Sequence, residues 1–395
     1  WRFIMSQINI RNLSNENDDG SPEIVGVSTF SATSFFVPPK GSTGERPSDC
    51  EPGSIRFNTD TANLEYFRGK TIGWSQFELV TPNLGGGTGS NTGLGTRGII
   101  GGGSRSGAVN EIRFITLSTM GADQDFGDLV HTAKRYLTGL ASRTRGVFQG
   151  GAPSSSPYGG TTDMEFITHA STGGGTDFGD CSTSHRGAGC ADQTRGVFTL
   201  GNSSPYNIIH YITIASAGSS RDFGDLSNSH RNIDGSGCSS STRGIFAGSY
   251  TPNIALGRDD INFVTISTQG NTTDFGTLST ITFAQQSSSS NSTRGIFSGG
   301  YGGSPDSQNT IQFITIATTG NTTDFGDLTN QRKRSMSLPS PTRAVIVGGG
   351  VAPSEGNVTT MEKVEILTTG ASVDFGTLAN GVQASGYFSN GHGGL

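Results

Sequence analysis

Charge is scarce in this chain, and the charge that is present does not collect in one place. Asp, Glu, Lys and Arg make up 15% of the 395 residues, and the net charge is -6. A phosphate-binding surface needs clustered Lys and Arg, and the one compact basic run, residues 332–334, is interpreted as a solvated loop. No segment approaches the ~20 apolar residues of a membrane-spanning helix. We therefore predict no nucleic-acid partner and no membrane span.

Cysteine is also rare, and its spacing argues against a metal site. Cys50, Cys181, Cys190 and Cys238 form no Cys-x-x-Cys pair, a spacing common in zinc sites. Cys190 and Cys238 end the equivalent strings GAGC and GSGC, so we expect small buried residues with free thiols. We predict no metal and no cofactor.

Glycine, by contrast, is abundant, with 61 copies, and 23 Phe residues recur at regular places. The apolar fraction of 31% could indicate disorder, but disorder usually also brings high net charge or few aromatic residues. The composition instead indicates a folded chain of short strands joined by many turns.

Two short motifs recur in phase from residue 96 onward. The steps of the first motif, Thr-Arg-Gly (Thr-Arg-Ala in the last copy), are 48, 50, 48, 51 and 49 residues, between Thr96, Thr144, Thr194, Thr242, Thr293 and Thr342. The second motif, Asp-Phe-Gly, begins at Asp125, Asp177, Asp222, Asp274, Asp324 and Asp374. Between the motifs lie segments such as EIRFITLST, which alternate as half-buried strands do. Each repeat is therefore predicted to contain four short antiparallel strands.

Four-stranded units of this length match the blades of β-propellers. We predict an all-β protein with a six-bladed propeller over residues 96–395, and seven blades as the alternative. The string SGYFSNG, residues 385–391, is similar to another copy of the Thr-Arg-Gly strand, and we expect it to complete the first blade. The phenylalanines of the second motif are expected to fill the gaps between blades: Phe126, Phe178, Phe223, Phe275, Phe325 and Phe375.

Within each repeat, a strand that ends in Gly-Gly is followed by the alternating strand and then by an aromatic strand. The Gly-Gly pairs are at 150–151, 299–300 and 348–349, and Arg186 and Arg231 lie in the segments before two of the repeats. This pattern resembles that of kelch-type propellers. It departs from kelch in having Phe for the usual Trp, and in lacking Gly-Gly in the repeats that begin at Thr194 and Thr242.

The N-terminal part does not share the repeat. Residues 1–46 are predicted to be an extended docking arm, with Met5 as the natural initiator, residues 47–83 a small β-hairpin module, and residues 84–95 a Gly/Ser/Thr linker. The module resembles a β-hairpin segment of tail fibres and other virion proteins of tailed bacteriophages. The matching residues are Gly53, Arg56, Asn58, Thr59, Thr61, Tyr66, Phe67 and Trp74.

Together these resemblances imply a structural or appendage protein of a phage virion, like a tail or neck fibre, with a cyanophage as the suggested source. Such a protein would attach to other virion proteins through residues 5–85, in several copies per particle, and would display the propeller to a host-surface glycan or receptor or to neighbouring subunits. The alternatives are a non-viral kelch-like interaction adaptor and, less favoured, a glycan-degrading propeller enzyme. The sequence lacks the S-x-D-x-G-x-W turns of sialidase-like enzymes.

No catalytic residues are predicted. The Asp-Phe-Gly string occurs in protein kinases, but here it is repeated six times without the companions that phosphoryl transfer needs. The pairs His185-Arg186 and His230-Arg231 have no third ligand, so they are interpreted as loop anchors. Binding is expected instead in the variable loops after the Thr-Arg-Gly strands, where we predict contact aromatics at Tyr158, Tyr206, Tyr250 and Tyr301.

Overall fold

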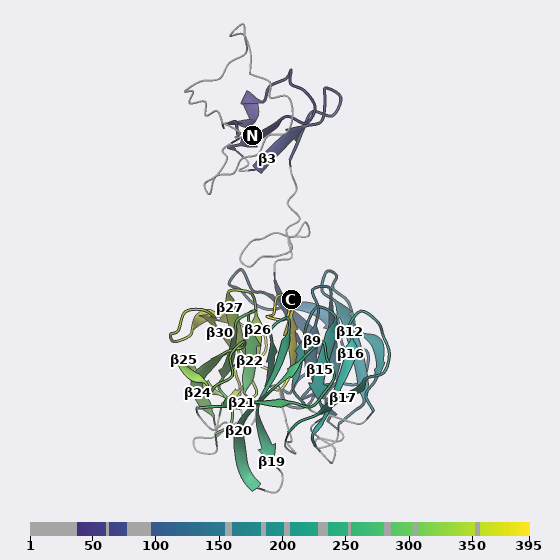
Figure 1. Cartoon of the computed structure of the whole chain (residues 1–395), viewed down its shortest axis with the longest axis vertical. Helices are drawn as coiled ribbons and strands as arrows, with labels where there is room; N and C mark the ends of the chain where they lie inside the picture. The colour runs from purple at the N-terminus through teal and green to yellow at the C-terminus, as the bar shows by residue number, and fades with distance from the viewer. Residues whose placement is uncertain are drawn as a thin grey trace, which may run out of the picture. The chain divides into compact units, whose positions relative to one another are not determined.

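The structure, a computed structural model, contains thirty-two strands and one short 3-10 helix in the residues it describes (Figure 1). These residues are 38–60, 63–76, 96–154, 160–182, 187–200, 206–227, 236–251, 254–279, 286–302, 307–351 and 356–395. The chain divides into two compact units, residues 1–79 and 80–395. The prediction of an all-β protein is confirmed for the described residues.

The N-terminal unit contains one four-stranded sheet in the order β1-β2-β3-β4. Its elements are β1 (Lys40–Gly41), η1 (Thr43–Glu45), β2 (Ile55–Asn58), β3 (Asn63–Phe67) and β4 (Trp74–Gln76). β2 and β3 form the expected hairpin, and β1 pairs with β2 in parallel. The sheet thus takes in Lys40–Gly41, which the sequence assigned to the arm, because the backbone there bonds to that of β2 and the residue after it. Of the predicted arm, residues 38–46 are described and belong to this unit, whereas residues 1–37 and the linker lie outside the described residues.

The C-terminal unit contains six four-stranded antiparallel sheets in its described residues, one for each repeat. Sheet 1 contains β32 (Gly386–Ser389), β5 (Arg97–Gly101), β6 (Glu111–Thr116) and β7 (Gln124–Asp128). Sheet 2 contains β9 (Thr138–Ala141), β10 (Arg145–Gln149), β12 (Asp163–Thr168) and β13 (Thr176–Asp180). Sheet 3 contains β14 (Gly189–Ala191), β15 (Arg195–Thr199), β16 (Ile208–Thr213) and β17 (Arg221–Asp225).

The next three sheets repeat this order. Sheet 4 contains β18 (Gly237–Ser239), β19 (Arg243–Thr251), β20 (Ile254–Thr265) and β21 (Thr273–Thr277). Sheet 5 contains β22 (Ser287–Ser290), β23 (Arg294–Ser298), β24 (Gln308–Thr315) and β25 (Thr323–Arg332). Sheet 6 contains β26 (Met336–Pro339), β27 (Arg343–Val347), β30 (Thr360–Glu365) and β31 (Val373–Thr377). Two small ribbons add β8 (Lys134–Arg135) with β11 (Ala152–Pro153), and β28 (Gly350–Val351) with β29 (Gly356–Asn357).

The motifs of the sequence fall on fixed strands. The Thr-Arg-Gly motif begins the second strand of each sheet, the alternating segment forms the third, and Asp-Phe-Gly lies in the fourth. The prediction of four antiparallel strands per repeat is confirmed. The pairing of the C-terminal strand with the first repeat is confirmed as well, since β32 pairs with β5 with Phe388 opposite Ile99.

The first strands of successive sheets also contact one another. β9 contacts β14, β14 contacts β18, β18 contacts β22, and β22 contacts β26. The series continues from β26 to β32, and β32 in turn contacts β9. The order of contacts therefore returns to the strand from which it began.

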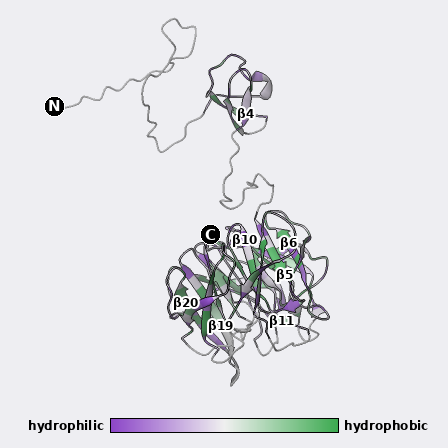
Figure 2. Ribbon diagram, turned by 90° about the vertical axis from the view of Figure 1, so that its right-hand side faces the viewer, coloured by the Kyte–Doolittle hydropathy of each residue, from purple (hydrophilic) through white to green (hydrophobic). Residues whose placement is uncertain are grey.

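Apolar side chains pack between neighbouring sheets and not at one common centre. One cluster joins Ile112 and Phe126 of sheet 1 to Phe148 and Ile167 of sheet 2, all buried. Another joins sheet 6 to sheet 1. Figure 2 shows the hydrophobic character of β5, β6 and β10, which supply such residues. Because each cluster needs two sheets, no sheet can bury its apolar residues alone.

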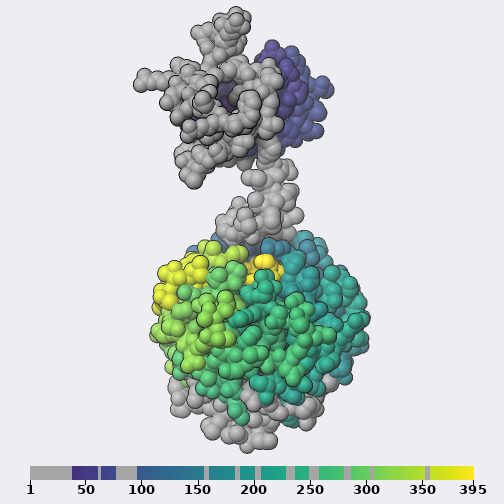
Figure 3. Space-filling view, viewed as in Figure 1, coloured from purple at the N-terminus to yellow at the C-terminus, as the bar shows by residue number. Residues whose placement is uncertain are grey.

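Strand direction gives this unit two distinct faces. The second strands begin, and the third and fourth strands are joined, on the face that contains Thr96 and the C-terminal residues, which we call the entry face. Figure 3 shows C-terminal residues, in yellow, at the surface of this face. The second strands end on the opposite face, which we call the loop face, where the β19–β20 hairpin projects (Figure 1).

Candidate functional site

The six motif phenylalanines lie between sheets. Each side chain is at most 2% exposed. Five of them meet an aromatic ring on the third strand of their own sheet at 6.0–6.2 Å between centroids, edge to face. This is a favourable geometry for aromatic pairs. Their surroundings are those of core residues.

The arginines of the Thr-Arg-Gly motif form contacts that the sequence analysis did not foresee. In every repeat Nη1 of this arginine donates a hydrogen bond to a backbone oxygen of the next sheet, and we call this contact the arginine clamp. The acceptors are His169 O (from Arg97, 2.8 Å), Ile214 O (Arg145, 3.2 Å), Ile266 O (Arg195, 2.9 Å), Ile316 O (Arg243, 3.0 Å), Ile366 O (Arg294, 3.0 Å) and Leu117 O (Arg343, 3.3 Å). The last clamp runs from sheet 6 to sheet 1.

An aromatic ring supports the clamp in the first five sheets. The guanidinium lies 4.1–4.6 Å from the centroid of the ring that is also paired with the motif phenylalanine, a cation–π geometry. In sheet 6 the ring is replaced by Lys363, and Arg343 lies near Glu365. The sequence contained one indication of this contact: an arginine at the same position of all six repeats, in a chain that has few charged residues.

Backbone hydrogen bonds close the outer edge of five sheets. The amide of the glycine in the turn between third and fourth strands donates to the motif phenylalanine of the preceding sheet, for example Gly173 N to Phe126 O at 2.7 Å. The motif glycine beside it, Gly127, has a φ of 146°, and a Cβ there would lie 2.4 Å from Gly173 O. Backbone conformation and close approach both require glycine, and the edge strand is protected from pairing with other chains.

A third contact between sheets is a polar side chain on each third strand, half-buried in sheet 1 and buried in sheets 2 to 6. The residues at this position are Arg113, Glu165, His210, Asn262, Gln312 and Glu362. Gln312 Oε1 accepts from Ser279 N at 2.9 Å, and Glu362 Oε2 accepts from Thr329 N at 2.9 Å, so each binds the end of the preceding sheet's fourth strand. These polar residues are therefore engaged in holding sheets together.

The centre, where the first strands meet, is filled by small residues. A cavity of about 50 Å³ remains, lined by glycines, serines and both Cys190 and Cys238. Tyr387 crosses this region, and its hydroxyl oxygen accepts a hydrogen bond from Ser288 N at 3.1 Å. A space of this size suits one or two water molecules, which leaves no room for a substrate.

The C-terminal residues cover the entry-face end of this centre. His392 Nε2 is 2.8 Å from Ala141 O, and a Cβ on Gly394 would lie 1.9 Å from Ala191 O. Nearby His169 is 2% exposed and its ring lies edge to face with Phe388. Burial lowers the pKa of His169 to about 3 and that of His392 to about 4, so both rings are neutral at pH 7.

Of the four loop tyrosines, the structure describes the side chains of Tyr206 and Tyr301. Tyr158 lies outside the described residues, as do His185-Arg186 and His230-Arg231, and Tyr250 is in β19 but its side chain is outside them too. Tyr206 is half-buried with a positive φ of 66°. Tyr301 is half-buried, and Lys333 Nζ lies 5.3 Å from its ring centroid. Tyr206 belongs to sheet 3 and Tyr301 to sheet 5, so the two rings are on non-adjacent sheets.

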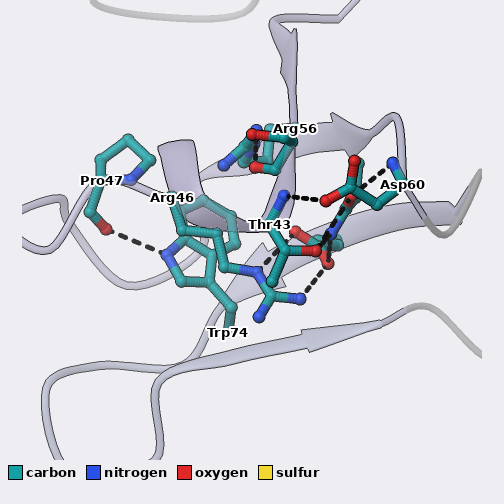
Figure 4. A network of polar contacts seen from close by, with 9 residues as sticks. Thr43, Arg46, Pro47, Arg56, Asp60 and Trp74 are labelled. Carbon is teal, nitrogen blue, oxygen red and sulfur yellow. Dashed lines mark hydrogen bonds and ion pairs between the residues drawn. The ribbon is translucent and has the colours of Figure 1, made fainter.

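In the N-terminal unit, motif residues converge on one polar network (Figure 4). Glu65 is fully buried, accepts from Arg46 and from Asn58 Nδ2 (2.7 Å), and hydrogen bonding from Arg46 keeps its pKa low. Arg56 Nη2 donates to Ser42 O at 3.0 Å.

Trp74 completes the network. Its Nε1 donates to Pro47 O at 3.0 Å, and the Arg56 guanidinium lies 5.8 Å from its ring. The segment 42–47 is thereby held against the hairpin, which gives Arg56, Asn58 and Trp74 a structural role in this unit.

Within the parts of the chain that the structure describes, no three His, Cys, Asp or Glu side chains gather as metal ligands. In the same residues no helix has the length and apolarity to cross a bilayer. All four cysteines are free thiols. A scan of protein-family models gives no match to this chain, and a search of curated proteins gives none either.

Proposed function

We propose that the six sheets are the blades of a closed, six-bladed, kelch-like β-propeller. The arginine clamp supports closure, because its six steps lead from sheet 1 through sheets 2 to 6 and back to Leu117 of sheet 1. The contacts among first strands follow the same cyclic order. Completion of sheet 1 by the C-terminal β32 is the usual way to seal such a ring, and it leaves six sheets without a seventh in the described repeats.

We further propose that this propeller is the displayed part of a structural or appendage protein of a phage virion, with the N-terminal unit attached to the particle. One observation carries the proposal: the C-terminal unit receives and ends its chain on the entry face, while its variable loops follow strands that end on the loop face. We propose the loop face, which carries the variable loops, as the surface that contacts a host-surface glycan, a receptor or a neighbouring subunit. Loops on a rigid scaffold are where binding commonly resides.

The arrangement of polar residues supports a binding role in preference to catalysis. The arginine of the Thr-Arg-Gly motif and the polar residue in the middle of each third strand are engaged between sheets, and only a cavity of about 50 Å³ remains at the centre of the proposed ring. Repetition by itself also favours structure, because an acid–base pair requires two carboxylates in different environments.

The test is the composition of purified particles. Particles from a gradient, washed in high salt, should contain this chain at a fixed ratio to the major virion protein, measured by quantitative mass spectrometry. Limited proteolysis should release residues 96–395 and leave peptides from residues 1–79 on the particle. The proposal is contradicted if washed particles lack the chain. It is also contradicted if the chain is recovered bound to a cellular protein, which is the result expected of an adaptor.

A further inference from the structure

Sheet 3 breaks the symmetry of the repeats at one cross-strand pair. The third-strand residue beneath the arginine clamp is Tyr211, where sheets 1, 2, 4 and 5 have Phe114, Phe166, Phe263 and Phe313. The residue opposite it on the fourth strand is Arg221, where sheets 2, 4 and 5 have Thr176, Thr273 and Thr323. Sheet 3 thus adds a phenol hydroxyl and a second guanidinium at one place.

These substitutions line an open cleft of about 240 Å³ on the entry-face side of sheet 3. Arg195 and Tyr211 are both part of the lining and stack at 4.6 Å from guanidinium carbon to ring centroid. The turn with Ser216 and Ser219 and the exposed Arg221 complete the polar lining. Only Nη1 of Arg195 is used by the clamp, at 2.9 Å from Ile266 O; within the described residues the rest of this guanidinium has no further hydrogen bond.

The charge of the cleft has one sign. Two arginines and no carboxylate line it. The neighbouring Asp222 is paired with His210, one position along the strand and therefore on the other side of the sheet. A planar guanidinium binds a carboxylate through two parallel hydrogen bonds, and Tyr211, Thr213, Ser216 and Ser219 supply hydroxyl groups that can bind further hydroxyls.

We propose that this cleft binds a sugar residue that carries a carboxylate. Arg221, with the free edge of Arg195, would bind the carboxylate, and the Tyr211 hydroxyl and the serine turn would bind the ring hydroxyls. The cleft is larger than an isolated ion needs, and its hydroxyl lining suits a polyol. This inference adds a glycan contact on the entry-face side of sheet 3, apart from the loop face and its tyrosines, and it rests on the proposed contact with a surface glycan for its biological meaning.

The test is calorimetric titration of the full chain with a trisaccharide of galacturonate, beside the matching trisaccharide of galactose and sodium sulfate. The acidic trisaccharide should bind, and the neutral one and sulfate should bind at least ~10-fold more weakly. Arg221→Thr should weaken the acidic ligand ~10-fold, and Tyr211→Phe should weaken it by a smaller factor. Both variants introduce residues that other sheets already have at these positions, so the melting temperature should not change.

A charge-matched control separates the site from general attraction. The variant Arg221→Thr with Thr323→Arg keeps the net charge and moves the guanidinium to sheet 5, and it should bind as weakly as Arg221→Thr alone. The proposal is overturned if this control restores binding, if Arg221→Thr binds like the unaltered chain, if sulfate binds as tightly as the acidic sugar, or if no trisaccharide binds. These binding results are independent of the proposed location in virus particles, which is tested separately by mass spectrometry of purified particles.

Discussion

At the scale of single residues, one position that is aliphatic in five of the six sheets is a histidine in the remaining one. The position is the residue that directly follows the third strand. It is Leu117 in sheet 1 and isoleucine in sheets 3 to 6, and each of these side chains is buried. In sheet 2 it is His169. Among the described residues, neither ring nitrogen of His169 has a hydrogen-bond partner of normal geometry. An imidazole therefore occupies a position that is apolar in the other five sheets, and the half-buried His392 lies close to it.

This placement predicts a loss of stability in mild acid. Both histidines titrate near 6.5 in an unfolded chain, whereas burial lowers the pKa of His169 to about 3 and of His392 to about 4 in the folded chain. Above pH 6.5 neither state binds these protons, so stability is unaffected. Below it the unfolded state alone binds them, and the free energy of unfolding falls by about 1.4 kcal/mol per histidine per pH unit until the folded pKa is reached.

The measurement is urea unfolding of the full chain at several pH values between 7 and 4. His169→Ile, which introduces the residue of sheets 3 to 6, should reduce the slope of stability against pH and raise stability at pH 5. His392→Gln should also reduce the slope. An unchanged slope in both variants would show that these rings are accessible to protons in the folded state.

At the scale of strands, the short C-terminal strand β32 makes contacts with several sheets. Its four residues cover the edge of β5, and Phe388 packs 4.6 Å from Phe148 of sheet 2, centroid to centroid. Tyr387 reaches Ser288 of sheet 5 from the same strand. β26 of sheet 6 also contacts this strand, so one short strand contacts four sheets, and the residues after it cover the centre.

Removal of this strand should destabilise the whole C-terminal unit. A chain that ends at Ser385 loses the buried Phe388, a loss that costs roughly 3–5 kcal/mol when Phe is replaced by Ala in other cores, and exposes the β5 edge to other chains. We expect a lower melting temperature and aggregation detected by light scattering. The matched control ends at Asn390, retains β32, and should aggregate less; equal behaviour of the two truncations would contradict the role given to β32.

The strands were the part of the structure most readily predicted from sequence. The two motifs at constant spacing and the alternating segments between them predicted four strands per repeat. The likeness of residues 385–391 to the Thr-Arg-Gly strand predicted that this segment pairs with the first repeat. The arginine clamp was missed because its partners are backbone oxygens about seventy residues away, which leave no trace in composition or spacing. The start of the N-terminal sheet was missed because Lys40–Gly41 pairs through backbone alone, so its side chains show no alternation.

At the scale of the molecule, the account depends on whether the six sheets form a closed ring. Repetition predicts identical neighbours, but it cannot distinguish a ring from a linear stack, because both bury the same faces between sheets. The distinction lies in the junction of sheet 6 with sheet 1, where Arg343 meets Leu117 and where a Cβ on Gly376 would lie 2.5 Å from Gly121 O. The cleft of sheet 3 could not be predicted from the repeats, because Tyr211 and Arg221 lie outside the motifs that the repeats share.

The distance across this junction is the most direct test. Met120 and Val373 are 62% and 54% exposed, so nitroxide labels at Met120→Cys and Val373→Cys, with Cys50→Ser to remove the one cysteine that is not buried, should leave the fold intact. Because Val373 is three strand residues from Gly376, the ring predicts strong dipolar broadening at a backbone separation of about 10 Å. A linear stack would place five spacings of ~10 Å between the labels, and a separation of about 50 Å would contradict closure.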